Sequence, residues 1–165
     1  MDREIVVIAH NIRSAHNIGS LLRTCDAMGV KEVILSGYTP YPKARHDDRL
    51  PHIADKVNGQ IVKTALGAEK SQSWRHAPVI GEVLEKASKD GYTLCSLEQS
   101  KGSIALDKFK PPKKAALILG NEVAGLEKAV LDKSDYIVEI PMLGQKESLN
   151  VIQAAAIALY AFRFN

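Results

Sequence analysis

The stretch that decides the fold reads Tyr136-Ile137-Val138-Glu139-Ile140-Pro141-Met142-Leu143-Gly144-Gln145-Lys146-Glu147-Ser148-Leu149-Asn150 and continues into an apolar run that ends at Phe164. Pro141 cannot donate to a sheet and Gly144 tolerates a positive φ, so a buried strand should stop there and pass into a tight loop. The apolar run predicts a long closing helix. Ser148 and Asn150 stand at its start, where either could simply cap the helix or bond locally.

The first forty residues predict a strand, a helix and a second strand. Ile5 to Ala9 is a continuous β-branched run of the kind found in parallel strands covered on both faces. Asn17 is placed to cap a helix that Gly29 would end, and Val33 to Leu35 resumes as a strand. The apolar residues of that helix follow the helical spacing: Ile18, Leu21, Leu22, Cys25 and Met28.

The remainder continues the alternation of helices and strands. Gly37 to His52, with three prolines, predicts a long loop that faces substrate. The expected helical segments are Ile53–Val57, Ala65–Lys70, Pro78–Lys89 and Leu126–Leu131, and the expected strands are Tyr92–Leu97, Ala115–Leu119 and Tyr136–Ile140. This order predicts a three-layer α/β fold with a mostly parallel sheet, formed by residues 1–165 as a single domain.

Composition narrows the class of protein. The chain has 165 residues, of which 45% are hydrophobic and 25% charged, as in soluble globular domains. No apolar run reaches the length of a membrane helix and the N-terminus lacks a signal pattern, so we expect a cytoplasmic protein with no membrane partner. Cys25 and Cys95 lie in apparent regular elements without metal-ligand spacing, which predicts buried free thiols and no metal.

Charge is uneven along the chain although the net charge is only +3. Lysines, arginines and histidines concentrate between Tyr41 and His76, and a second basic run precedes Ala115. Such runs are most often solvated surface, but beside a site they would contact phosphates.

Unusual polar residues follow three of the predicted strands. In open α/β sheets, ligands bind at the carboxyl ends of strands, so these residues are the candidates for a site. Dinucleotide-binding, P-loop, nucleophile-elbow and zincin motifs are all absent from the sequence. The candidates form three patterns: Asn17-x-Gly19-x-x-x-Arg23, Leu119-Gly120-Asn121-Glu122-x-x-Gly125-Leu126, and Ile140-Pro141-Met142-x-Gly144-x-x-x-Ser148-Leu149-Asn150.

Together these patterns resemble the three sequence motifs of the SpoU (TrmH-like) branch of the SPOUT methyltransferases, in the same order and over essentially the whole chain. The resemblance implies a deep trefoil knot near the C-terminus, with S-adenosylmethionine bound inside it mainly by backbone groups. By position, the implied cofactor-binding residues are Leu97, Glu98, Leu119, Gly120, Asn121, Ile140, Met142, Gly144, Ser148 and Leu149.

The reaction that the resemblance implies is methyl transfer to a ribose 2′-hydroxyl of tRNA or rRNA. The implied catalytic residues are Arg23, Asn17, Glu122, Ser148 and Asn150. A guanidinium stays protonated in proteins, so we assign Arg23 to stabilising charge on the 2′-oxygen and the adjacent phosphate rather than to acting as a base. We expect Glu122 to orient Arg23 or Asn17, and Ser148 with Asn150 to shape the loop and contact the ribose.

The resemblance also implies a homodimer in which the partner subunit completes the site. Larger relatives carry an additional RNA-binding domain, so RNA selection by the single domain expected here would rest on Gly37 to His76 or on the dimer. Two alternatives stay open: a non-catalytic RNA-binding relative that keeps the fold, and a methyltransferase that acts on a small molecule or a protein.

Overall fold

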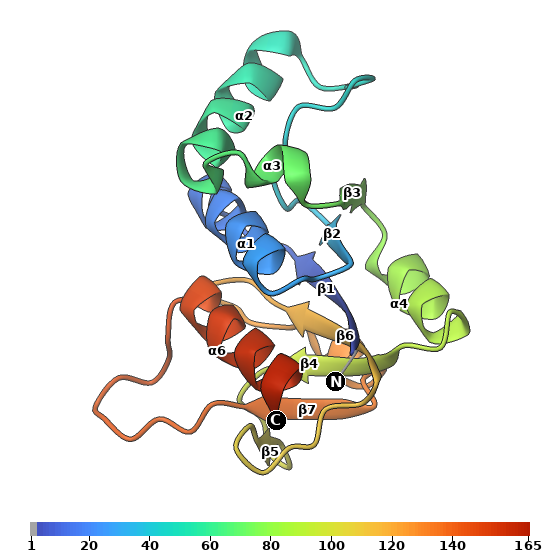
Figure 1. Ribbon diagram of the computed structural model, residues 1–165, viewed down its shortest axis with the longest axis vertical. Helices are drawn as coiled ribbons and strands as arrows, with labels where there is room; N and C mark the ends of the chain where they lie inside the picture. Colours follow the sequence, from blue (N-terminus) through green and yellow to red (C-terminus); the bar gives the residue numbers. More distant parts are fainter. Residues whose placement is uncertain (1–2) are drawn as a thin grey trace.

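The computed structural model describes residues 3–165 and shows a parallel sheet with helices on both faces (Figure 1). The elements follow in the order β1 (Glu4–His10), α1 (Ala15–Ala27), β2 (Glu32–Ser36), α2 (Pro51–Ala65), α3 (Ala68–Ser71), β3 (Trp74–Ala77), α4 (Ile80–Lys89), β4 (Thr93–Leu97), β5 (Ile104–Ala105), β6 (Lys114–Leu119), α5 (Lys128–Leu131), β7 (Tyr136–Glu139) and α6 (Val151–Phe164). The predicted α/β class with a mostly parallel sheet is confirmed.

Within residues 3–165 the sheet has seven strands in the order β3-β2-β1-β6-β4-β7-β5, and every pair of neighbouring strands is parallel. β6 lies at the centre, where Leu117 pairs with Val7 of β1 on one side and with Cys95 of β4 on the other. Parallel strands all end at the same edge, so the segments that follow β1, β4, β6 and β7 meet there.

Alternate residues of the strands face two separate hydrophobic cores. Odd-numbered residues such as Val7 and Leu117 pack with α1 and α6, whereas even-numbered residues such as Ile8 and Ile118 pack with α4 and α5. This two-sided burial explains the continuous apolar strands, because no face of the central strands meets water. Cys25 and Cys95 are buried free thiols as predicted, and burial raises the pKa of Cys95 to about 12.

Helix α2 corrects the prediction for the region after residue 50. The expected turn at Ile53–Val57 lies within one longer helix of 15 residues, Pro51–Ala65, whereas the expected turn at Ala65–Lys70 overlaps the single turn of α3. Only Ala54, Ile61 and Ala65 of α2 are buried, and Asn58 and Gly59, which both have low helix propensity, lie at its centre, so the sequence suggests a short turn in place of a long helix. α2 packs along α1 and extends away from the sheet (Figure 1).

Three smaller predictions also need correction. Ser14, not Asn17, caps α1, since its hydroxyl accepts from the Asn17 N–H. Pro78 precedes α4, which begins at Ile80. The edge strands β3 and β5 were not predicted, because their short, half-buried sequences carry no strand pattern. No helix within residues 3–165 is both long and apolar enough to cross a membrane.

Candidate active site

A pocket of about 230 Å³ opens at the carboxyl ends of β4, β6 and β7. Three segments far apart in the sequence form it: the end of β4, the loop after β6, and the loop that leads from β7 into α6. Its lining residues are Leu97, Glu98, Gln99, Leu119, Gly120, Asn121, Glu122, Val123, Ala124, Gly125, Glu139, Ile140, Met142, Ser148, Leu149, Val151 and Ala154.

The structure brings together nine of the ten residues expected to bind a cofactor. The exception is Gly144, which lies in the same loop but does not line the pocket. The lining also includes residues that sequence reasoning missed: Gln99, Val123, Ala124, Gly125, Glu139, Val151 and Ala154. Most of them are direct neighbours of predicted residues, so the continuity of each loop was the available signal.

The loop after β6 is fixed by close backbone packing and one asparagine. A Cβ on Gly120 would lie 2.6 Å from the carbonyl carbon of Gly125, and Gly125 has a φ of 68°, so both positions exclude larger residues. The Asn121 Oδ1 accepts from the N–H groups of Val123 and Ala124 at 2.9 and 2.8 Å. The Glu98 carboxylate accepts from the Leu126 N–H at 2.9 Å, which ties this loop to β4.

Glu122 joins this loop to the start of α1. Its carboxylate accepts from the backbone N–H groups of Arg13 and Ser14 at 2.9 and 3.2 Å, and from the Asn17 Nδ2 at 2.9 Å. Partial burial raises the pKa of Glu122, but these hydrogen bonds outweigh burial, so the pKa lies below its ordinary value. Glu122 is therefore a fixed carboxylate that orients Asn17.

Arg23 stands apart from this group. It lies six residues beyond Asn17 on α1, about 9 Å along the helix axis, and does not line the pocket. Its side chain is exposed and makes no hydrogen bond or ion pair with residues 3–165. Of the two partners expected for Glu122, the structure pairs it with Asn17 and not with Arg23.

Ser148 and Asn150 differ in their contacts. Asn150 caps α6, because its Oδ1 accepts from the Ile152 N–H at 2.9 Å. Ser148 lines the pocket and is exposed. The loop between β7 and α6 extends away from the body of the molecule (Figure 1), with Leu143 97% exposed. One contact outside the loop is the hydrogen bond from Gln99 Nε2 to the Glu147 carbonyl, at 2.8 Å.

The pocket combines apolar walls with backbone polar groups. Leu97, Leu119, Ile140, Met142 and Leu149 supply the walls, and the irregular loops around them present N–H and C=O groups. Such a site suits a flat heterocycle that needs apolar contact and a few fixed hydrogen bonds. Among residues 3–165 there is no group of three or more side chains that could ligate a metal.

Comparison with known proteins places the chain in a family. The model of the SpoU rRNA methylase family matches residues 4–160. The 23S rRNA (guanosine(2553)-2′-O)-methyltransferase RlmP of Bacillus subtilis is 31% identical over 162 residues, which is 96% of this chain and 57% of that protein. The tRNA (guanosine(18)-2′-O)-methyltransferase of Saccharomyces cerevisiae is 26% identical over 96% of this chain and 10% of its own length.

A solved structure agrees with the sequence relatives. The SpoU methyltransferase AviRb of Streptomyces viridochromogenes, in complex with the cofactor AdoMet, superposes with a TM-score of 0.78 at 28% identity, over 98% of this chain and 57% of that one. The chain thus spans a little over half the length of the bacterial relatives described here. Since the family model covers nearly every residue, the chain belongs to the SpoU rRNA methylase family.

Proposed function

We propose that this protein transfers a methyl group from S-adenosylmethionine to a ribose 2′-hydroxyl of tRNA or rRNA. The observation that carries the proposal is the junction of the pocket with Asn17: Glu122 lines the pocket and also binds the Asn17 amide. A cofactor site and polar groups able to act on a hydroxyl therefore meet at one edge of the sheet. Relatives with 2′-O-methyltransferase activity on rRNA and tRNA support the same reaction.

The pocket fits S-adenosylmethionine by its chemistry. Leu119, Ile140 and Leu149 offer apolar surface for adenine, and the backbone of the loops after β6 and β7 offers its hydrogen-bonding groups. The carboxylate of Glu98 already accepts from two backbone N–H groups, those of Gln99 and Leu126. When bound, the cofactor supplies an electrophilic methyl group on a sulfonium.

Two asparagines have complementary free groups. Asn17 donates through Nδ2 to Glu122, which leaves its Oδ1 to accept a hydrogen bond from a ribose hydroxyl. Asn150 accepts through Oδ1 at the cap of α6, which leaves its Nδ2 free to donate a hydrogen bond. One residue can thus orient the hydroxyl proton, while the other stabilises charge that develops on oxygen.

A homodimer would bring Arg23 into the site. Arg23 is exposed and distant from the pocket of its own chain, so we propose that it serves the pocket of a partner subunit. A surface for pairing exists on α6, where Ile157, Tyr160 and Phe164 follow helical spacing and are 45%, 58% and 64% exposed. An apolar helix face of this kind favours burial against a second copy.

Three further expectations complete the proposal. The loops after β6 and β7 meet at one pocket, which supports the trefoil knot that the resemblance implies. We propose that the chain forms one SpoU domain, because both hydrophobic cores pack against the same sheet. We place the protein in the cytoplasm, since free buried thiols suit a reducing compartment.

The test is incubation of the protein with radiolabelled S-adenosylmethionine and total RNA from the source cell, followed by mapping of the labelled nucleotide. Label on a ribose 2′-oxygen is expected. The variant Arg23→Ala should lose methyl transfer while it binds S-adenosylmethionine normally by calorimetry, because Arg23 does not line the pocket. RNA binding without transfer by the unmodified protein would instead identify a non-catalytic relative.

A further inference from the structure

Tyr38 is an exposed aromatic residue beside the pocket mouth, two residues after the end of β2. It is 62% exposed, and its hydroxyl accepts from the Asn121 Nδ2 at 2.9 Å. Asn121 itself lines the pocket. The Asn121 side chain therefore connects the Tyr38 ring to the proposed methyl-transfer site.

The ring is held in place although water surrounds it. The Tyr38 N–H donates to Asn11 Oδ1 at 3.2 Å, which fixes the backbone at one end, and the bond to Asn121 fixes the phenol at the other. The next residue, Thr39, is 1% exposed, and its hydroxyl accepts from the Ile12 N–H and bonds the Ala9 carbonyl. An exposed tyrosine side chain normally rotates, and stacking against a base would restrict that rotation. Because hydrogen bonds already hold Tyr38, stacking costs it less conformational entropy.

A second exposed apolar residue also contacts Asn121. Val123 is 82% exposed, and its N–H donates to the same asparagine through Oδ1. Asn121 thus positions Tyr38 with its Nδ2 and Val123 with its Oδ1. Through these bonds Asn121 links the Tyr38 ring to the backbone of a pocket-lining loop.

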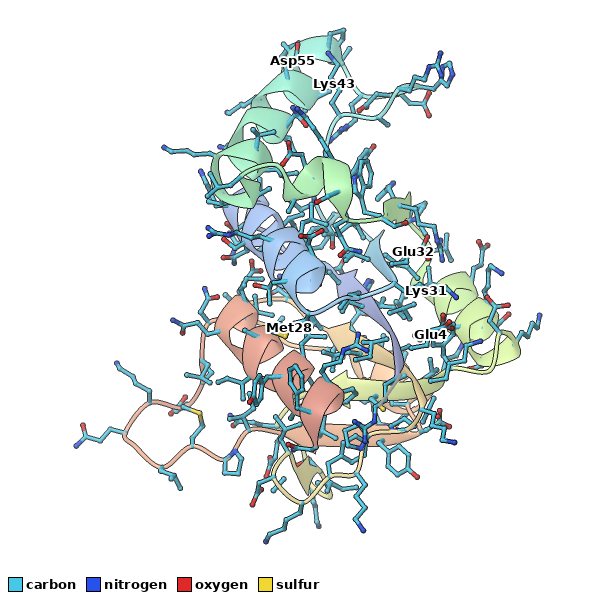
Figure 2. The ribbon with its side chains drawn as sticks, in the orientation of Figure 1. Glu4, Met28, Lys31, Glu32, Lys43 and Asp55 are labelled. Atoms are coloured by element: carbon cyan, nitrogen blue, oxygen red, sulfur yellow. The ribbon has the colours of Figure 1, made fainter. Side chains whose placement is uncertain are left out.

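The loop that continues from Tyr38 carries the basic residues. We call residues 37–50 the arm loop. Within it, Tyr41 has no free face, because His76 stacks on the ring at 4.1 Å between centroids and the Arg49 guanidinium lies 3.7 Å from its centre. Arg45 and His46 are exposed, whereas Arg49 forms an ion pair with Asp47. Lys43 forms an ion pair with Asp55 (Figure 2). Tyr38 is therefore the tyrosine of this loop that a ligand can reach.

An accessible aromatic ring between a reaction site and basic side chains is the arrangement that binds single-stranded nucleic acid. Resting on the proposed function, we propose that Tyr38 is the platform on which a nucleobase of the substrate RNA stacks, at or next to the target nucleotide. The base must be unpaired, since a base inside a duplex has no free face. The arm loop would then follow the adjoining phosphates.

The experiment compares Tyr38→Ala and Tyr38→Phe in equilibrium binding to bulk transfer RNA and to oligoadenylate. Loss of one stacked base weakens binding roughly 5- to 150-fold, so the alanine variant should show a loss of that size for both RNAs. The phenylalanine variant keeps the ring and should bind within about twofold of the unmodified protein. The loss should not change with salt, because stacking releases no counterions.

Tyr136→Ala is the matched control, since Tyr136 is also exposed but lies at the opposite end of the sheet. Unchanged binding by Tyr38→Ala would overturn the inference, as would an equal loss in Tyr38→Phe, which would assign the effect to the Asn121 bond. Thermal unfolding and S-adenosylmethionine affinity of each variant confirm that the fold and pocket persist. If the unmodified protein binds RNA without methyl transfer, the proposed function fails and this comparison still decides the role of Tyr38.

Discussion

At the scale of single residues, the contact between Glu122 and Asn17 shows what sequence could and could not predict. The motifs identified both residues as members of a site. They did not show that Glu122 pairs with Asn17 rather than Arg23, because the pairing depends on how α1 is rotated against the loop after β6. The rotation is set by packing of α1 on the sheet and on α2, which no local pattern records.

We predict that Glu122→Gln lowers methyl transfer by about 10- to 100-fold, since an amide no longer fixes Asn17 as firmly. The Glu122→Gln substitution should also lower the free energy of unfolding by about 1–2 kcal/mol at neutral pH. The loss is modest because Glu122 is partly exposed and solvent weakens its hydrogen bonds. S-adenosylmethionine-dependent transfer assays and thermal unfolding measure the two effects.

The stability difference between the unmodified protein and the Glu122→Gln variant should decrease in acid. The folded state lowers the pKa of Glu122 through its hydrogen bonds, so the stabilisation is complete above the ordinary pKa of 4.5 and fades as pH falls through the lowered folded value. The gap in stability between the two proteins should therefore stay constant from pH 7 to about pH 5 and close in stronger acid. A gap that closes already above pH 6 would contradict this account.

Gly19 gives a second prediction for a single residue. A Cβ there would lie 2.1 Å from Thr64 Oγ1 and 2.2 Å from the Ile61 carbonyl oxygen, where α1 and α2 cross. Gly19→Ala should lower stability by about 1–3 kcal/mol or more, measured by urea unfolding, because backbone must move. Gly59→Ala on exposed α2 meets nothing within 4 Å and should instead raise stability by about 0.5–1 kcal/mol.

At the scale of elements, long apolar segments were predictable and short edge elements were not. β1, β6 and α6 consist mostly of apolar residues, many of them buried, and this apolar pattern alone predicts their structure. β3, with four half-buried residues, and β5, with two, exist only because a neighbouring strand offers hydrogen bonds. Their structure is decided by partners distant in sequence, which explains why the pattern failed there.

The start of α6 provides the prediction at this scale. Asn150→Ala removes the cap and should cost about 1 kcal/mol, whereas Asn150→Asp keeps a capping oxygen and should retain stability. If Asn150 Nδ2 also contacts the ribose, the aspartate variant should remain stable yet lose most methyl transfer. Ser148→Ala should leave stability unchanged, since Ser148 is exposed. An aspartate variant with full activity would limit Asn150 to capping.

For the whole molecule, the uncovered face of α6 is the feature that bears on assembly. Tyr160 and Phe164 contact each other at 4.8 Å between ring centroids but remain largely exposed in the single chain. The sequence described α6 only as an apolar closing helix. Which of its faces stays uncovered follows from packing on the sheet, so only the structure reveals it.

We predict that Ile157→Lys disrupts the proposed dimer and methyl transfer together, because a charge would be buried at the pairing surface. Light scattering should report a monomer with normal thermal stability. Ile53→Lys is the matched control: Ile53 on α2 is 43% exposed, close to the 45% of Ile157, and its replacement should leave mass unchanged. A fully active monomeric Ile157→Lys would exclude a shared site.

Mixing two inactive variants shows whether Arg23 acts on the pocket of its own chain or on the pocket of the partner subunit. A mixed dimer of Arg23→Ala and a variant that distorts the pocket loop, such as Gly120→Val, contains one intact pocket opposite one intact Arg23. Activity in the mixture shows that Arg23 acts across the dimer, and its absence shows that Arg23 acts within its own chain.

The strand order also fixes when the pocket can form during synthesis. β1 leaves the ribosome early, but its central partner β6 follows more than a hundred residues later, and the last lining residue is Ala154. A nascent chain can therefore pair β1 with β2 while the middle of the sheet is still missing. An interrupted translation product stopped before α6 would expose the core that α1 and α6 cover and would lack part of the pocket lining, so proteases can distinguish it from the finished protein.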